Sequence, residues 1–291
     1  MASIEPLNSA SGIPYYELPG PGSTLVFLHA NGYPPLSYQP LLEKLAQTHR
    51  VIGMCQRPLW PGADPTAIQN WEPLAADLVR FCCELSPAPS LGVGHSVGGN
   101  VLLRAALLHP DFFQAIVLID PVFFPRCMTL LWSAIFRLGL GYRLHPLVRG
   151  AVRRRRVFTS KALMFERYRR APVFSKIEDE GLQFYINAMA KPRPDGSVEL
   201  AYPPEWEARI YLTSVLKDLP LWSLLHTLKP PVLIVRGEHT DTFWHETARR
   251  FLRKLPDAQV VTIPDATHLL PLEKPQAVFS TINKFLSSLE L

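Results

Sequence analysis

The stretch LGVGHSVGGNV at residues 91–101 places one serine among four glycines, with apolar residues on both sides. The run SLGVGH is typical of a short buried strand, and GGNVLLRAALLH has the apolar spacing of a helix. Ser96 therefore occupies the centre of a G-x-S-x-G pattern on a sharp strand-to-helix turn. Glycine is needed two positions before and after it, because side chains there would collide with neighbouring backbone. We expect the turn to hold the Ser96 hydroxyl above the sheet, beside the free N–H groups of a helix N-terminus.

Short apolar runs alternate with longer amphipathic segments along most of the chain, which is typical of a parallel sheet covered by helices. The predicted strands are residues 23–29, 50–55, 90–95, 115–120, 231–237 and 258–264. The sequence thus predicts an α/β fold with a mostly parallel sheet flanked by helices.

The alternation stops between residues 121 and 219, a segment too long for a structureless loop. Helix-like apolar spacing predicts a mainly helical insertion there, with a turn or short hairpin and a proline-rich bend within residues 190–209. We therefore expect a core domain of residues 1–120 and 220–291, with residues 121–219 as the insertion. The run RRRR at residues 153–156 is most simply a solvated helix face, with an anion or membrane contact as the alternative.

A serine hydroxyl becomes a strong nucleophile only when a base takes its proton and an acid orients that base. His268 follows the last predicted strand, and Asp241 lies on the loop after residues 231–237. Because the carboxyl ends of parallel strands meet at one edge, both side chains are expected near Ser96. Asp120, at the end of another strand, is the second candidate for the acid.

The motifs GHSVGG, RGEHTD and ATHLLPLEKP, in the order serine, aspartate, histidine, resemble those of the α/β-hydrolase family over most of the chain. The resemblance implies a triad of Ser96 as nucleophile, His268 as base and Asp241 as acid. It also implies that the insertion forms a lid over the strand ends.

The same resemblance implies an oxyanion hole made of two backbone N–H groups. Val97, the residue after the nucleophile, supplies one of them. The other comes from the loop FLHANGYPP at residues 27–35, where this chain has HANG instead of the common His-Gly pair. Asn31 is favoured as that donor, with Ala30 next.

These residues predict acyl transfer through a covalent intermediate, and hydrolysis of a carboxylic ester with a hydrophobic acyl or alcohol part. Thioesterase, lactonase, C–C bond hydrolase and perhydrolase chemistry remain alternatives, as does a noncatalytic ligand-binding protein of the same fold. Candidate pocket residues, chosen for their position and apolar or aromatic character, are Tyr33, Phe123, Phe124, Trp132 and Leu269.

The composition is that of an ordinary soluble globular chain: 291 residues, 47% hydrophobic and 19% charged, with a formal charge of +5. The four cysteines have no metal-ligand spacing and no H-E-x-x-H motif is present, so we expect no metal and no cofactor. The predicted partner is a small ester-type substrate, without nucleic acid or integral membrane contact, in a cytoplasmic setting. The oligomeric state stays open.

Overall fold

The computed structural model describes residues 4–85, 90–214 and 216–289. Residues 1–3, 86–89 and 290–291 of the predicted core domain, and residue 215 of the predicted insertion, lie outside that part.

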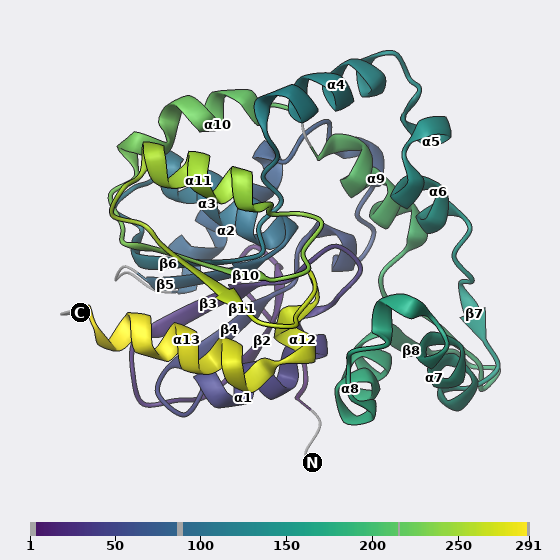
Figure 1. Ribbon diagram of the computed structural model, residues 1–291. Helices are drawn as coiled ribbons and strands as arrows, with labels where there is room; N and C mark the ends of the chain where they lie inside the picture. Colours follow the sequence, from purple (N-terminus) through teal and green to yellow (C-terminus); the bar gives the residue numbers. More distant parts are fainter. Residues whose placement is uncertain (1–3, 86–89, 215, 290–291) are drawn as a thin grey trace.

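An eight-stranded sheet forms the centre of the molecule, in the order β1-β2-β4-β3-β5-β6-β10-β11 (Figure 1). The pairs from β4 to β11 are parallel, whereas β1 and β2 pair antiparallel at one edge. The predicted α/β class with a mostly parallel sheet is confirmed. Sequence patterning did not predict the partly exposed β1 and β2, because neither contains a continuous apolar run. The strands are β1 Leu7–Asn8, β2 Pro14–Leu18, β3 Thr24–Leu28, β4 Arg50–Met54, β5 Ser90–His95, β6 Phe113–Ile119, β10 Val232–Gly237 and β11 Gln259–Ile263.

Helices cover both faces of this sheet. Helices α1 and α13 pack together on one face, and α2 and α3 pack together on the other, with α11 on the same side as α3 (Figure 1). The helices before β6 and after β10 are α1 Gln39–Leu45, α2 Glu72–Leu85, α3 Val97–Leu108, α11 His245–Lys254, α12 Leu270–Glu273 and α13 Pro275–Ser287.

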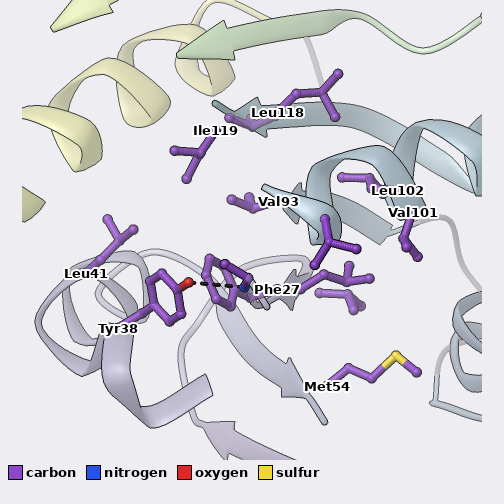
Figure 2. Packing of buried hydrophobic residues seen from close by; sticks show 14 of the residues in the cluster. Phe27, Tyr38, Leu41, Met54, Val93, Val101, Leu102, Leu118 and Ile119 are labelled. Atoms are coloured by element: carbon purple, nitrogen blue, oxygen red, sulfur yellow. Dashed lines mark hydrogen bonds between the residues drawn. The ribbon is translucent and has the colours of Figure 1, made fainter. Parts of the chain in front are cut away.

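The core lies between the sheet and these helices. Figure 2 shows Phe27 and Val93 from the central strands on the face of the sheet that α1 covers, whereas Val101 and Leu102 of α3 pack against the opposite face. All four side chains are fully buried. Burial of each such side chain contributes roughly 1.5–3 kcal/mol to folding, so α3 is held firmly against β5.

The segment between β6 and β10 is mainly helical and lies to one side of the sheet (Figure 1). The predicted hairpin is present as β8 and β9, and β7 adds a third antiparallel strand that was too short to recognise from its sequence. That this segment is a separate lid domain stays a prediction. Its elements are α4 Arg126–Arg137, α5 Gly141–Leu144, α6 Pro146–Val152, β7 Val157–Phe158, α7 Lys161–Arg169, α8 Asp179–Met189, β8 Ala190–Pro192, β9 Val198–Leu200, α9 Pro204–Thr213 and α10 Leu219–Leu224.

None of the helices in the described part of the chain is both long and apolar enough to cross a membrane.

Candidate active site

Ser96 stands on the turn between β5 and α3 with φ 58° and ψ −118°, a backbone conformation that is strained for a residue with a side chain. The two glycines of the motif allow this turn. A Cβ on Gly94 would lie 2.5 Å from the Gly98 carbonyl oxygen, and one on Gly98 would lie 2.4 Å from the Leu28 carbonyl oxygen. The close approach of β5, α3 and β3 therefore excludes side chains at both positions and fixes the Ser96 hydroxyl.

Three side chains form a hydrogen-bonded line at the carboxyl ends of β5, β6 and β11. The Ser96 Oγ lies 2.9 Å from Nε2 of His268, and Nδ1 of His268 lies 2.5 Å from Oδ2 of Asp120. Asp120 is fully buried, and its backbone N–H donates to the Val235 carbonyl at 2.7 Å. The Thr240 hydroxyl also donates to Oδ2 of Asp120. A base is thus in contact with the serine and oriented by a fixed carboxylate.

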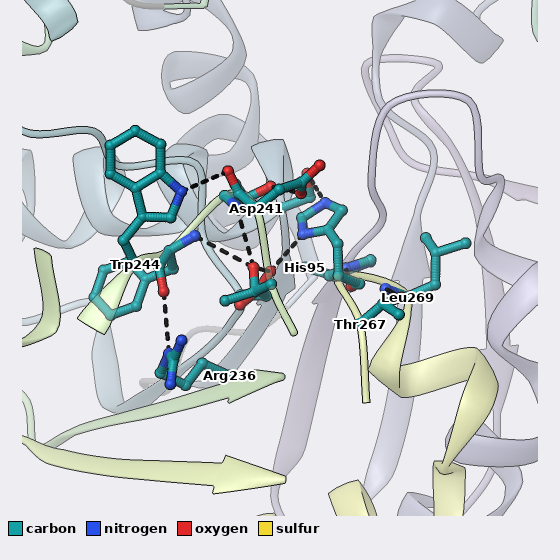
Figure 3. Close-up of polar contacts among 12 residues, drawn as sticks. His95, Arg236, Asp241, Trp244, Thr267 and Leu269 are labelled. Atoms are coloured by element: carbon teal, nitrogen blue, oxygen red, sulfur yellow. Dashed lines mark hydrogen bonds and ion pairs between the residues drawn. The ribbon is translucent and has the colours of Figure 1, made fainter. Parts of the chain in front are cut away.

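Asp241 does not contact His268, so the sequence-based ranking of Asp241 over Asp120 is corrected. The Asp241 side chain is exposed and accepts a hydrogen bond from the Thr242 hydroxyl at 3.1 Å. Its backbone carbonyl accepts from the Trp244 indole at 2.8 Å (Figure 3). The loop after β10 turns Thr240 inward and leaves Asp241 outside. Asp120 directly follows the apolar run AIVLI at residues 115–119, and a buried carboxylate there requires a partner, but this signal alone could not rank the two acids.

The charges around His268 favour its protonated form. Burial acts to lower the pKa of His268, but the hydrogen bond and charge of Asp120 outweigh it and raise the pKa above its ordinary value. The charge of Asp241 adds to this rise. Asp241 therefore influences the base electrostatically without holding it.

Tyr38 and His95 form a buried hydrogen-bonded pair that the sequence did not indicate. The pair connects the segment after β3 to the loop that carries His268. The Tyr38 hydroxyl lies 2.8 Å from Nδ1 of His95, and Nε2 of His95 lies 2.9 Å from the His268 carbonyl oxygen. Burial holds the pKa of His95 well below its usual value, so the ring is neutral. Because a carbonyl only accepts, Nε2 carries the proton and Nδ1 accepts from Tyr38. His95, adjacent to the nucleophile, thus supports the backbone of His268.

The same tyrosine distinguishes the two candidate oxyanion donors. The Ala30 N–H donates to the Tyr38 hydroxyl at 3.1 Å and is occupied. The N–H groups of Asn31 and Val97 donate to no acceptor within the described residues. Both residues line the cavity beside Ser96, so these two N–H groups are available to a ligand there.

The 121–219 segment holds the Asn31 loop in place. The Asn31 side chain donates to the Glu207 carbonyl at 3.0 Å and accepts from the Tyr202 hydroxyl at 2.8 Å. A Cβ on the next residue, Gly32, would lie 3.3 Å from Nη1 of Arg154. The position of the backbone N–H of Asn31 therefore depends on packing against this segment.

The prediction that residues 153–156 form a solvated helix face is wrong for Arg154. Helix α6 ends at Val152, and the Arg154 guanidinium turns inward to pair with Glu207 at 2.5 Å. It also donates to the hydroxyls of Tyr168, at 2.9 Å, and Tyr185. The other three arginines of the run are exposed. The spacing of residues along the chain could not show that one of the four arginines, Arg154, has buried partners.

A cavity of about 480 Å³ opens over Ser96 and His268. Of the predicted pocket residues, Tyr33, Phe124 and Leu269 are part of its lining. Phe123 instead packs in the core, 4.4 Å between ring centroids from Trp222, because neighbouring residues on an extended segment point to opposite sides. Trp132 packs against Phe136 and His145 and does not line the cavity. Apolar and aromatic lining residues that sequence reasoning missed include Trp71, Val122, Leu147, Val173, Ile210 and Tyr211.

No group of three histidine, cysteine, aspartate or glutamate side chains within the described ranges is arranged to hold a metal ion.

Comparisons with known proteins agree with this fold. A 2-(acetamidomethylene)succinate hydrolase of Mesorhizobium japonicum is 23% identical over 270 residues, which cover 92% of this chain and 90% of that enzyme. A crystal structure of E-2-(acetamidomethylene)succinate hydrolase superposes with a TM-score of 0.74 at 21% identity, covering 98% of this chain and 99% of that one.

A type I acyl-CoA thioesterase of Penicillium roqueforti is 32% identical over 127 residues, a match that covers 38% of this chain and 29% of that enzyme. The chain thus aligns with less than a third of the length of that thioesterase. The sequence model of the Alpha/beta hydrolase family matches residues 25–281, nearly the whole chain. Together with the strand-to-helix turn at Ser96 and the parallel sheet, this match shows that the chain belongs to the Alpha/beta hydrolase family.

Proposed function

We propose that this protein hydrolyses a carboxylic ester with a hydrophobic acyl or alcohol part, through a triad of Ser96, His268 and Asp120. The observation that carries the proposal is the continuous line of two hydrogen bonds, 2.9 Å from Ser96 to His268 and 2.5 Å from His268 to Asp120. A ligand-binding protein has no need of a base and a buried acid aligned with a strained serine.

In the first half of the reaction, the Ser96 oxygen attacks the ester carbonyl carbon while Nε2 of His268 takes the hydroxyl proton. Asp120 stabilises the imidazolium that forms. The tetrahedral intermediate collapses, the bond to the alcohol oxygen breaks, and His268 returns the proton to that oxygen. The product of this half is an acyl-serine and a free alcohol.

In the second half, water attacks the acyl carbon while His268 takes a proton from that water. The bond between the acyl carbon and the Ser96 oxygen then breaks, His268 returns the proton to Ser96, and the carboxylic acid leaves. In both halves the carbonyl oxygen becomes an oxyanion. The N–H groups of Asn31 and Val97 are the donors we assign to it, and each such donor contributes about 3 kcal/mol to transition-state stabilisation in hydrolases of this kind.

The cavity supports the choice of a hydrophobic substrate. Aromatic and aliphatic side chains make up much of its lining, among them Tyr33, Phe124, Leu147, Ile210 and Tyr211. Burial of a chain methylene in such a cavity contributes about 0.8 kcal/mol, so the catalytic efficiency should increase with acyl length until the cavity is filled.

A thioester is the second candidate substrate, favoured by the partial match to a fungal acyl-CoA thioesterase. The same triad and oxyanion donors serve both reactions, since only the leaving atom changes from oxygen to sulfur. Lactone, C–C bond and peracid chemistry remain further alternatives for the same site.

The test is a panel of p-nitrophenyl esters of increasing acyl length, assayed with the wild-type protein and with Ser96→Ala. We expect an initial burst of p-nitrophenol, steady turnover and a phosphonate adduct on Ser96 by mass spectrometry, all absent in the variant. A parallel assay with acyl-CoA substrates of the same acyl lengths compares kcat/KM for oxygen and sulfur leaving groups. A well-folded wild-type protein that neither turns over nor forms the adduct would refute the proposed hydrolysis.

A further inference from the structure

The charges of the 121–219 segment are strongly segregated. Between Asp120 and Glu166 the sequence contains no aspartate or glutamate, although it contains eight arginines and one lysine. This stretch includes α4, α5 and α6, which follow one another along the outer edge of the molecule (Figure 1). Their outer surface therefore carries positive charge without any acidic residue of its own.

Helix α4 buries two polar side chains and exposes two leucines. Thr129 and Ser133 are buried, with exposed fractions of 0% and 8%, whereas Leu130 and Leu131 are 57% and 53% exposed. Leu138, directly after the helix, is 72% exposed. A helix in contact with water places its leucines inward, so this orientation indicates an outer environment that is apolar.

The exposed apolar residues of the molecule are concentrated in the same region. Nine of the twelve large apolar side chains that are exposed among the described residues lie between positions 130 and 173. Single exposed apolar side chains are normal on a protein surface, but a concentration of this kind marks an interaction surface.

Arginines are interspersed with these apolar side chains and are free to pair with anions. Six of them make no ion pair with any carboxylate in the described part of the chain: Arg126, Arg137, Arg143, Arg149, Arg153 and Arg155. The long apolar part of an arginine side chain can lie along hydrocarbon while the guanidinium reaches a phosphate.

The surface is continuous with the mouth of the active-site cavity. Leu147 on α6 and Val173 are 55% and 54% exposed, and both also line the cavity over Ser96. The proposed surface and the lining of the cavity therefore share Leu147.

We propose that the outer surface of α4, α5 and α6 docks on the surface of an anionic lipid bilayer, with the leucines in the interface and the arginines on lipid phosphates. A second copy of this chain fits less well, because a symmetric interface would place the same unpaired arginines against one another. Apolar side chains and basic residues side by side are the composition that binds a bilayer without spanning it. The inference does not depend on the proposed hydrolysis.

The test is co-sedimentation of the full-length protein with vesicles of phosphatidylcholine, with and without phosphatidylglycerol. We expect binding to the mixed vesicles that weakens as salt is added, and much weaker binding to phosphatidylcholine alone. Each arginine near an anionic surface strengthens binding about fivefold, so R143Q/R149Q/R153Q should weaken it about 100-fold. L130S/L131S should weaken binding to the mixed vesicles as well.

Two controls separate this result from a general effect of charge or of misfolding. R249Q/R253Q/K254Q removes the same charge from α11, outside the proposed surface, and should leave vesicle binding within about twofold, because charges beyond a Debye length of the lipid are screened. The variants at the proposed surface should keep their thermal stability and their turnover of p-nitrophenyl acetate, since none of the altered side chains lines the cavity.

Three outcomes would overturn the proposal. The wild-type protein could fail to bind the mixed vesicles, or R249Q/R253Q/K254Q could lose binding as strongly as R143Q/R149Q/R153Q. Light scattering could also show a dimer that L130S/L131S dissociates, with no vesicle binding, in which case a second copy covers the surface.

Discussion

Replacement of Asp120 by asparagine, compared with the same replacement of Asp241, separates the two carboxylates near His268. Asp120 is buried and in direct contact with Nδ1 of His268, whereas Asp241 is exposed and makes no hydrogen bond to that ring. The proposed mechanism forms an imidazolium in each half-reaction, so the loss of a contacting negative charge raises both barriers.

The expected magnitudes follow from the two environments. At an effective dielectric constant of about 20 and about 4 Å between charge centres, Asp120 stabilises the imidazolium by about 4 kcal/mol, or about 10³-fold in rate. In bulk water two unit charges at the same separation attract each other by only about 1 kcal/mol. The loss of kcat/KM in Asp241→Asn is therefore limited to about fivefold. The assay is kcat/KM on a p-nitrophenyl ester, with thermal unfolding of each variant to verify the fold.

The pH dependence gives a second measurement on the Asp241→Asn variant. His268 must be neutral to accept the serine proton, so activity rises with pH through the pKa of His268. Because the Asp241 charge helps to raise that pKa, its removal lowers the pKa and shifts the acidic limb of the profile to lower pH. The assignment of Asp120 would be refuted if Asp120→Asn kept more than a tenth of the activity while Asp241→Asn lost about 10³-fold.

Three further variants test the supporting structure. Tyr38→Phe removes the hydrogen-bond partner of His95 and of the Ala30 N–H, so we expect a loss of about 1–3 kcal/mol in the free energy of unfolding, measured in urea, and a lower kcat. Asn31→Ala releases the oxyanion loop from the 121–219 segment, and stopped-flow assays should show kcat reduced about tenfold with KM little changed, because the affected N–H acts in the transition state. Gly98→Ala places a Cβ 2.4 Å from a backbone carbonyl oxygen, and calorimetry should show destabilisation by about 3 kcal/mol or more, whereas an unchanged Tm would contradict the close approach at the turn.

Local sequence determined the strands of the parallel sheet and the turn that presents Ser96. Apolar runs of strand length and apolar spacing of helical period are properties of neighbouring residues, so they can be read without knowledge of the fold. The requirement for glycine at position 94 has the same short range, because a Cβ there would meet the backbone of Gly98, whereas the requirement at Gly98 comes from Leu28 on a distant strand. The order of Ser96 and His268 along the chain, each after a strand, placed both at one edge of the sheet.

Only the tertiary structure decided which of the two candidate acids contacts His268 and which of the candidate backbone N–H groups is already occupied. Asp120 and Asp241 both follow parallel strands, and the path of one loop places Thr240 rather than Asp241 against the buried site. The Ala30 N–H donates to the hydroxyl of Tyr38, eight residues further along the chain, and is thereby occupied.

Arg154 likewise found partners far away in the sequence, whereas its neighbours in the same run stayed exposed. The direction of a side chain on a loop follows from packing against distant segments, and no local pattern of residues encodes it. The sequence by itself therefore determined the strands of the parallel sheet and the edge at which Ser96 and His268 meet, while long-range contacts decided which carboxylate lies against His268 and that the Ala30 N–H is occupied.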